Sequence, residues 1–184
     1  MNMVTRSIFL NGTVGVGKTT VAARLGEILE RELLPHAIID LDELRRAWPA
    51  PMHDRFNHEL ELANLAAMAA NFVRAGVSMF VLAGVIEDPR EVPRYRAALG
   101  NLPLTVCRIT ASESVRRARL VDRHRYEPDA LAWHLERTVE LESILAQQAL
   151  DDVVVDSSDS SAEVVAQEVL TVVRALGSHH RVGQ

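Results

Sequence analysis

The chain has 184 residues and a formal net charge of −5, with an isoelectric point of about 5.8. That length predicts one domain whose core needs no disulfide or structural metal. The acidic balance does not favour nucleic acid as a partner, because a phosphate backbone binds basic surfaces. The longest apolar stretch, residues 77–86, is too short to span a bilayer, and no charged-then-apolar leader opens the sequence. We therefore expect a soluble cytoplasmic protein that binds neither nucleic acid nor membrane.

A short apolar run, Ser7–Leu10, predicts a buried strand, and a glycine-rich segment follows it. Residues 12–19, Gly-Thr-Val-Gly-Val-Gly-Lys-Thr, fit the pattern G-x-x-x-x-G-K-[ST] of the phosphate-binding P-loop. Apolar residues at helical spacing then predict a helix over 18–34. The motif needs this order of strand, loop and helix, because the loop N–H groups and the helix N-terminus then face the phosphates.

Lys18 is the only lysine of the sequence, and we predict that it bridges the outer phosphates as a catalytic residue. The Thr19 hydroxyl is predicted to bind Mg²⁺. The alternative is a glycine-rich turn that merely precedes a helix. The complete set of predicted nucleotide-binding residues is Gly12, Thr13, Val14, Gly15, Val16, Gly17, Lys18, Thr19, Thr20 and Arg119.

The second apolar run, Ala37–Ile39, ends in two aspartates, Asp40 and Asp42. Alternate residues of an extended chain point to the same side, so both carboxylates are predicted to face one cleft. We expect Asp40 to lie near Mg²⁺ and its waters. Asp42 is predicted to take the proton from a substrate hydroxyl as a general base. The alternative is that residues 41–44 open a helix with Asp42 as its N-cap.

A proline-rich segment between this strand and a helix predicted over 57–75 has the composition of a loop that holds or covers a substrate. Arg45 could bind a phosphate, sulfate or carboxylate of the acceptor. Trp48 could stack on a ring, with packing as an equal alternative. Arg55 and Asp42 complete the predicted substrate-binding set.

The third apolar run, Ser78–Ala83, has no acid at its tip. P-loop ATPases and GTPases usually place an aspartate there for Mg²⁺, so its absence favours a small-molecule kinase. A helix over 90–99 and a strand over 104–109 follow. Cys107, the lone cysteine, lies in that apolar strand, which favours a buried small side chain over a reactive thiol.

An arginine-rich helix is predicted over 112–125. Arg116, Arg119 and Arg123 share one face, at positions i, i+3 and i+7. Because stacked like charges repel, this face is predicted to bind an anion, with Arg123 as a catalytic residue that neutralises the charge of a transferred phosphoryl group. The alternative is a solvated basic face that pairs with nearby acids.

Boundary signals support the helices on either side of residue 126. Thr110 and Glu113 could form a capping box at the start of the arginine-rich helix. Pro128 suits the first turn of a helix over 129–149. These signals place two consecutive helices between the fourth and fifth strands.

The last predicted strand covers 152–155 and the last helix 161–176, with Gly177 as a C-terminal stop. We therefore predict one domain over residues 1–178 and a flexible tail over 179–184. Apolar strand-like runs alternate with helical patterns throughout, which is typical of an α/β protein with a parallel sheet. In such sheets ligands bind beyond the C-terminal ends of the strands.

The P-loop, the Asp40-x-Asp42 pair and the segment from Arg119 to Arg123 resemble the P-loop kinases of small metabolites. Familiar members are the shikimate, gluconate and adenylylsulfate kinases and chloramphenicol phosphotransferase. The resemblance covers about residues 7–176. It implies a P-loop NTPase three-layer sandwich, with a five-stranded parallel sheet between helices and a small arginine-rich lid. It also implies that ATP and Mg²⁺ bind and that residues 156–161 lie near the adenine.

Two departures limit what the resemblance implies about the acceptor. Shikimate kinases carry a glycine triplet after the third strand, where this chain has only Gly84. Arg45, three residues after Asp42, matches the adenylylsulfate kinases, but the rest of their substrate signature is absent. No named substrate is therefore expected from the resemblance.

The predicted function is ATP-dependent transfer of the γ-phosphoryl group to a hydroxyl, or a similar group, of a small molecule. The alternative is a P-loop ATPase or regulatory protein without a small-molecule acceptor. A third hypothesis is a degenerate domain that binds phosphate without turnover. We expect the chain to act as a monomer or a homodimer.

Overall fold

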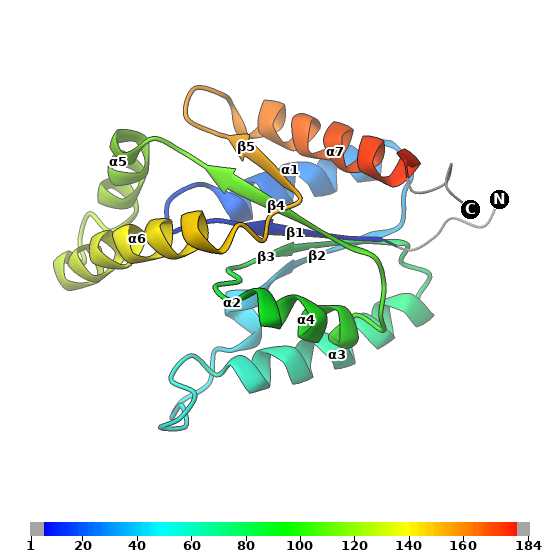
Figure 1. The fold of residues 1–184 in the computed structure, drawn as a ribbon, viewed down its shortest axis with the longest axis horizontal. Helices are drawn as coiled ribbons and strands as arrows, with labels where there is room; N and C mark the ends of the chain where they lie inside the picture. Colours follow the sequence, from blue (N-terminus) through cyan, green and yellow to red (C-terminus); the bar gives the residue numbers. More distant parts are fainter. Residues whose placement is uncertain (1–5, 180–184) are drawn as a thin grey trace.

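A single parallel sheet organises the computed structural model of this chain, which describes residues 6–179 (Figure 1). The strands of the described region pair in the order β2-β3-β1-β4-β5. This arrangement confirms the α/β fold with a five-stranded parallel sheet. The strands are β1 (Arg6–Asn11), β2 (His36–Asp40), β3 (Met79–Ala83), β4 (Leu104–Thr110) and β5 (Val153–Asp156).

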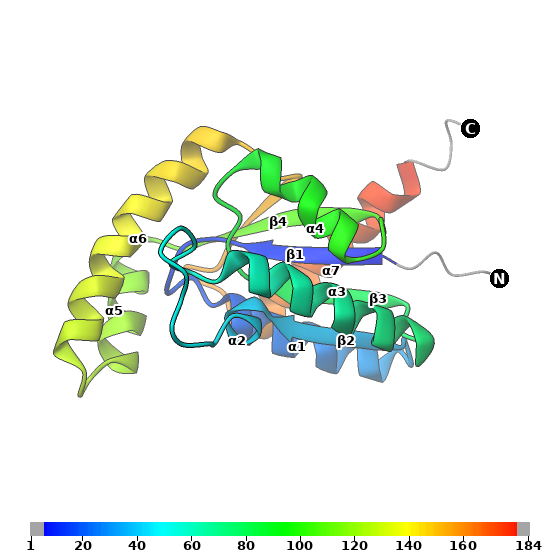
Figure 2. The same ribbon diagram turned by 90° about the horizontal axis from the view of Figure 1, so that it is seen from below.

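Helices cover both faces of the sheet and form a projection at one end (Figures 1 and 2). Helices α1 and α7 pack together on one face, and α3 and α4 pack together on the other. The antiparallel pair α5–α6 extends from the end toward which the strand arrows point. The helices are α1 (Lys18–Arg31), α2 (Leu41–Leu44), α3 (His58–Arg74), α4 (Val92–Ala98), α5 (Glu113–Arg123), α6 (Pro128–Gln148) and α7 (Ala162–His179), with a 3₁₀ turn, η1 (Pro89–Glu91), before α4.

Two apolar cores lie on opposite faces of the sheet. Ile8 and Leu10 of β1 belong to the core under α1 and α7, whereas Phe9 belongs to the core under α3 and α4. This alternation follows from the pleat of a strand. Because both faces are covered, the strand reads as a continuous apolar run. Cys107 of β4 is also buried, and burial raises the pKa of its thiol to about 12, which makes the thiol unreactive.

Strand register brings the functional segments to one edge of the sheet. Leu10 of β1 stands beside Ala83 of β3, and Ala83 stands beside Asp40 of β2. On the other side of β1, Asn11 stands beside Arg108 of β4. The segments that follow β1, β2 and β3 therefore leave the sheet at the same level. Chain order reverses at β1, which is where α/β sheets form their binding crevice.

Several predicted boundaries differ from the structure; helix α1, for example, ends at Arg31 instead of residue 34. Ser112, rather than Thr110, caps α5, because Thr110 is still paired in β4; the Ser112 Oγ accepts a hydrogen bond from the Val115 N–H at 3.4 Å. The arginine-rich helix ends at Arg123. Helix α7 continues past Gly177 to His179, since glycine costs only about 1 kcal/mol in a helix and does not by itself end one. The rest of the predicted tail, 180–184, lies outside the described residues.

Within residues 6–179, none of the helices combines the length and the apolar character that a membrane span requires.

Candidate active site

The loop between β1 and α1 has a backbone that glycine alone adopts without strain. Gly12 has a φ of 138°, and a Cβ at this position would lie 2.4 Å from the Ile109 carbonyl oxygen of β4. Gly17 has a φ of 97° and forms the N-cap of α1. The first turn of α1 has neither a capping side chain nor an acidic residue. Its N–H groups are therefore free to bind an anion.

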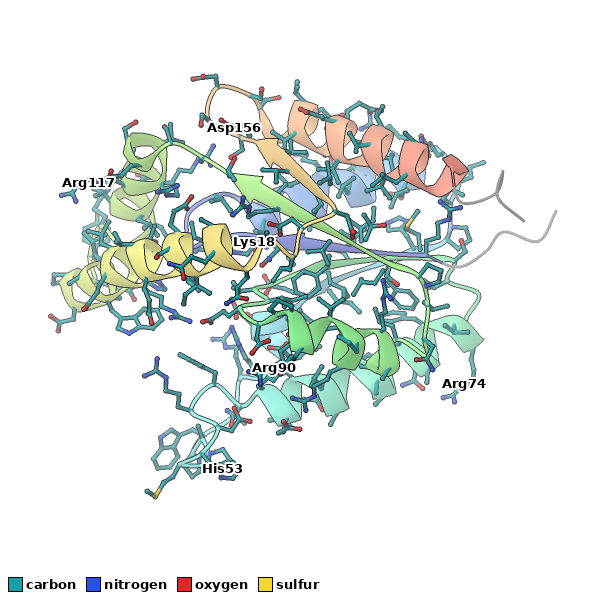
Figure 3. The ribbon with its side chains drawn as sticks, in the orientation of Figure 1. Lys18, His53, Arg74, Arg90, Arg117 and Asp156 are labelled. Atoms are coloured by element: carbon teal, nitrogen blue, oxygen red, sulfur yellow. The ribbon has the colours of Figure 1, made fainter. Side chains whose placement is uncertain are left out.

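Lys18 lies at the mouth of this loop, where the sheet meets the α5–α6 pair (Figure 3). Its ammonium group donates hydrogen bonds to the Gly12 carbonyl at 2.8 Å and the Thr13 carbonyl at 3.1 Å. Burial lowers the pKa of Lys18 to about 8, although Asp42 and Asp40 act in the opposite direction. The cation that the motif requires is therefore held close to both aspartates.

Thr19 and Asp40 lie in direct contact. The Thr19 Oγ1 donates to Asp40 Oδ2 at 3.0 Å, and Asp40 Oδ1 accepts from the Asp42 N–H at 3.1 Å. Among the residues that the structure describes, no three acidic, histidine or cysteine side chains gather in a way that could hold a metal alone. Mg²⁺ in phosphoryl-transfer sites needs only one or two protein oxygens, with phosphates and waters as the other ligands. Thr19 and Asp40 fit that requirement.

Asp40 and Asp42 line the same cavity, as predicted, but for a different reason. Asp40 ends β2 and caps the short helix α2, whereas Asp42 lies inside the first turn of that helix. The alternative of a helix over 41–44 is therefore right, and its cap is Asp40 instead of Asp42. The Asp42 side chain is exposed to the cavity and accepts a hydrogen bond from Arg45.

The three arginines that share a face of α5 have three different environments. Arg116 is buried, donates to the Ala111 carbonyl at 2.5 Å and pairs with Glu142 of α6 at 3.0 Å. Its expected role in binding an anion at the cavity is therefore wrong, because Arg116 does not line the cavity and its charge is already paired with Glu142. Arg119 and Arg123 both line the cavity.

Arg119 connects the P-loop to the loop after β5. Its guanidinium donates to the carbonyls of Gly15 at 3.3 Å and Val16 at 3.0 Å, and to the side chain and carbonyl of Ser157 at 3.1 and 3.0 Å. Arg123, in contrast, forms no ion pair with a carboxylate within residues 6–179, and its charge acts on Lys18. Arg123 is therefore the α5 arginine that is available to a phosphate.

The cavity has a volume of about 700 Å³ and extends to both sides of the P-loop. Residues 14–20 line it, whereas Gly12 and Thr13 lie beneath; the Thr13 hydroxyl donates to the Thr138 carbonyl of α6 at 3.1 Å. Ser157 and Ser160 line one end, within the segment 156–161 that the resemblance places near an adenine.

The opposite end differs from the predicted substrate site. Arg45 lines it, but Trp48 is 93% exposed and Arg55 contacts the Phe56 ring from outside the cavity, at 4.5 Å. Both lie in the loop that projects away from the sheet, whose tip is marked by His53 in Figure 3. A proline-rich loop has few neighbours that hold it inward, so its aromatic side chain does not reach the cavity.

The lining residues for which the sequence predicted no role include Glu87, Trp133, His134 and Arg137. Glu87 follows β3 by four residues, so an acid does stand after that strand. The other three lie on α6, which was predicted only as a helix, and a spacing of four between Trp133 and Arg137 was the available signal. His134 stacks on His124 at 4.5 Å, and burial, followed by the charges of His124 and Arg123, lowers its pKa.

These elements define a P-loop domain of the kinase type: a parallel sheet with a phosphate-binding turn after β1, and a cavity between that turn and a helical pair. The chain belongs to the family described as "AAA domain", whose sequence profile matches residues 8–132. None of the curated proteins matches this chain.

Solved structures of a gluconokinase, a tunicamycin resistance protein and a shikimate kinase share the fold. A gluconokinase from Sinorhizobium meliloti 1021 aligns over 100% of both chains, with 20% identity and a TM-score of 0.64. The Deinococcus radiodurans tunicamycin resistance protein aligns over 92% of this chain and 95% of its own, at 19% identity and a TM-score of 0.65. A shikimate kinase from Acinetobacter baumannii in complex with shikimate aligns over 94% of this chain and 95% of its own, with 17% identity and a TM-score of 0.59. At these identities the likeness concerns the fold alone.

Proposed function

We propose that this protein transfers the γ-phosphoryl group of ATP to a hydroxyl, or a similar group, of a small molecule. One observation carries the proposal: a single cavity contains the P-loop, the Thr19–Asp40 pair and, beyond them, the exposed carboxylate of Asp42. A site that only hydrolyses ATP does not need the further part of this cavity that Arg45, Phe56 and Glu87 line. The likeness of the fold to that of a solved gluconokinase and a solved shikimate kinase supports the same function.

Each part of the reaction has a candidate side chain. The α1 N-terminus and Lys18 bind the outer phosphates, and Arg123 neutralises charge on the transferred group. Asp42 accepts the proton of the acceptor hydroxyl while the new O–P bond forms and the bond to ADP breaks. Thr19 and Asp40 would hold Mg²⁺, which when bound neutralises charge on the β- and γ-phosphates. Ser157 and Ser160 would border the purine.

The test is an acceptor screen followed by one variant. The protein is incubated with ATP, Mg²⁺ and pooled metabolites and antibiotics, and products are detected by a mass gain of one phosphoryl group. Asp42→Asn should fold normally and lose turnover by about 10²-fold or more, the usual contribution of a positioned base. A folded Asp42→Asn variant with full turnover would rule out the base. Rapid ATP hydrolysis that no compound in the pool changes would favour an ATPase without a small acceptor.

A further inference from the structure

The acceptor end of the cavity contains two arginines that are already neutralised. Arg45 pairs with Asp42, and its second terminal nitrogen lies 3.4 Å from Glu61 Oε2. Arg137 pairs with Glu87 and, at 2.5 Å, with Glu140. Each guanidinium therefore meets two carboxylates. An arginine that is paired twice has little capacity left to bind an anionic group of a ligand.

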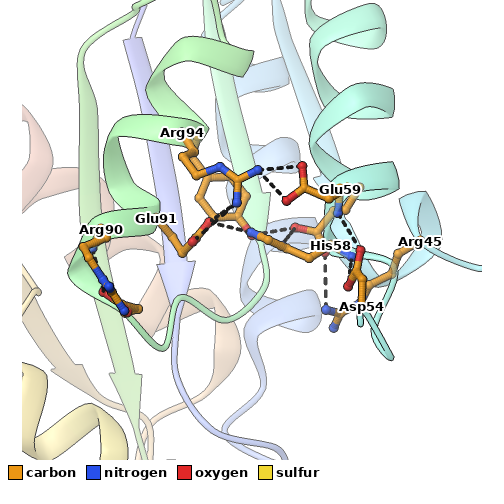
Figure 4. Close-up of polar contacts among 10 residues, drawn as sticks. Arg45, Asp54, His58, Glu59, Arg90, Glu91 and Arg94 are labelled. Atoms are coloured by element: carbon orange, nitrogen blue, oxygen red, sulfur yellow. Dashed lines mark hydrogen bonds and ion pairs between the residues drawn. The ribbon is translucent and has the colours of Figure 1, made fainter. Parts of the chain in front are cut away.

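Glu61 is what commits Arg45 to this arrangement. Its side chain is 2% exposed, and its other oxygen accepts a hydrogen bond from the Tyr95 hydroxyl at 2.5 Å. Figure 4 shows the surrounding network, in which Arg45 and His58 both approach the carboxylate of Glu61. A buried carboxylate that loses its cation is strongly destabilising, so Arg45 cannot turn away toward an anion at low cost.

The backbone around Arg45 is fixed as well. The Asn57 side chain, itself buried, donates to the carbonyls of Arg45 at 3.0 Å and Ala47 at 2.9 Å. Arg45 and Arg137 also lie over the same ring: the Arg45 guanidinium is 6.0 Å from the Phe56 centroid and the Arg137 guanidinium is 5.6 Å from it. The two Arg–carboxylate pairs therefore share one wall that is apolar at its centre.

This end of the cavity has an excess of negative charge, because the two guanidinium groups of Arg45 and Arg137 face four carboxylates, those of Asp42, Glu61, Glu87 and Glu140. Asp42 and Glu87 both line the cavity, with side chains 68% and 38% exposed. Burial, followed by the charges of His124 and Arg123, lowers the pKa of His134, which disfavours a positive charge on its ring. Lys18, Arg119 and Arg123, the lining cations without an ion pair to a carboxylate of residues 6–179, lie instead at the P-loop, where Arg119 is bound to carbonyls and to Ser157.

Resting on the phosphoryl transfer proposed above, we propose that the acceptor is a neutral or cationic hydroxyl-bearing compound. Its hydroxyl or ammonium groups donate to Asp42 and Glu87, and an apolar face of it packs on Phe56. The expectation that Arg45 binds a phosphate, sulfate or carboxylate of the acceptor is replaced by a positioning role: Arg45, held by Glu61, orients the Asp42 carboxylate.

Three sugars of similar size test the charge selection: glucosamine, glucose and glucuronate. Dissociation constants are measured by NMR titration of the protein saturated with a non-hydrolysable ATP analogue and Mg²⁺. We expect glucosamine to bind about tenfold or more tightly than glucuronate, with glucose between them, because an ammonium and a carboxylate have opposite energies beside fixed carboxylates. Glucuronate that binds as tightly as glucosamine, or the absence of measurable binding by all three sugars, would overturn the proposal.

Two variants and a control locate the selection. Glu87→Gln should remove most of the preference for glucosamine. Glu61→Gln frees Arg45 and should raise the affinity for glucuronate, whereas Glu59→Gln, on the same helix but paired with Arg94 outside the cavity, should leave all three constants unchanged. An unchanged order of affinities in both Glu87→Gln and Glu61→Gln would contradict the proposal even if one of them folded poorly.

The outcome separates this inference from the function on which it rests. Failure of the ATP analogue to bind would remove the proposed function. Phosphorylation that occurs only on anionic acceptors in the pooled screen would leave the kinase in place and exclude the acceptor class proposed here.

Discussion

The Lys18 side chain combines two opposing influences. Burial lowers its pKa from 10.5 to about 8, and the nearby Asp42 and Asp40 counteract part of that effect. At pH 8.5, part of the Lys18 population is therefore a neutral amine. A phosphate group beside it favours the ammonium form, so binding of a nucleotide is coupled to protonation.

We expect ATP binding at pH 8.5 to take up roughly three quarters of a proton, the neutral fraction of a group with a pKa near 8. The apparent affinity should fall as the pH rises through about 8, since the amine must be protonated before it pairs. Calorimetry in two buffers of different ionisation enthalpy measures the uptake. In Lys18→Arg the guanidinium stays charged, and uptake should disappear. Uptake that persists in this variant would assign the proton to another group.

Helix α5 shows why a shared face does not imply a shared role. The helical repeat places Arg116, Arg119 and Arg123 together, but the partners come from distant segments: Glu142 for the first and Ser157 for the second. Arg119 is the residue through which α5, the P-loop and the β5–α7 loop act as one unit. The order of residues 156–161, at the Ser157 end of the cavity, should depend on Arg119.

Replacement of Arg119 by methionine should weaken ATP binding by about tenfold or more and speed hydrogen exchange in residues 156–161, because four hydrogen bonds of a charged donor are lost. Arg117→Met is the matched control, since Arg117 lies on the outer side of the same helix and is exposed (Figure 3). Equal exchange rates in the two variants would show that the connection does not order the loop.

For the whole molecule, a ligand that binds only the folded state raises its stability. ATP with Mg²⁺ at 100 times its dissociation constant should add about 2.7 kcal/mol, which for a chain of this length corresponds to a rise in Tm of roughly 5–10 °C. Thermal unfolding with and without nucleotide measures the shift. The Lys18→Ala variant should keep the fold and lose most of the rise in Tm that nucleotide causes. A wild-type Tm that nucleotide leaves unchanged would be inconsistent with the proposed function.

Most of the fold could be predicted, because β1 and β3 are buried almost throughout and read as apolar runs, and helices such as α1 and α5 are amphipathic. The predicted strands agree with the observed ones within about one residue at each end. The order of the strands in the sheet came only from the structure, since it depends on contacts between distant segments. Helix ends were less predictable: Thr110 and Ser112 are both good caps, and only the length of β4 decides between them.

The P-loop end of the cavity was predictable because its residues are local in sequence. The P-loop and Asp40 need only the end of a strand and the start of a helix. The acceptor end is assembled from four segments, with Glu87, Phe56 and Arg137 far apart in the chain. No local pattern reveals that Arg45 is paired with Glu61, and Trp48 failed as a prediction because composition indicates a loop but not its direction.

The strand order has a further consequence for how such a protein can change. Because β1 lies in the middle of the sheet, the segments after β2 and β3 bring Asp42 and Glu87 to one side of the P-loop. The segments after β4 and β5 bring Arg119 and Ser157 to its other side. Substitutions in the segments after β2 and β3 could therefore change which acceptor is bound while the P-loop side of the cavity stays intact. Helix α6 contacts the P-loop through Thr138 and lines the opposite end of the cavity with Arg137, so it is an element on which the two selections would conflict.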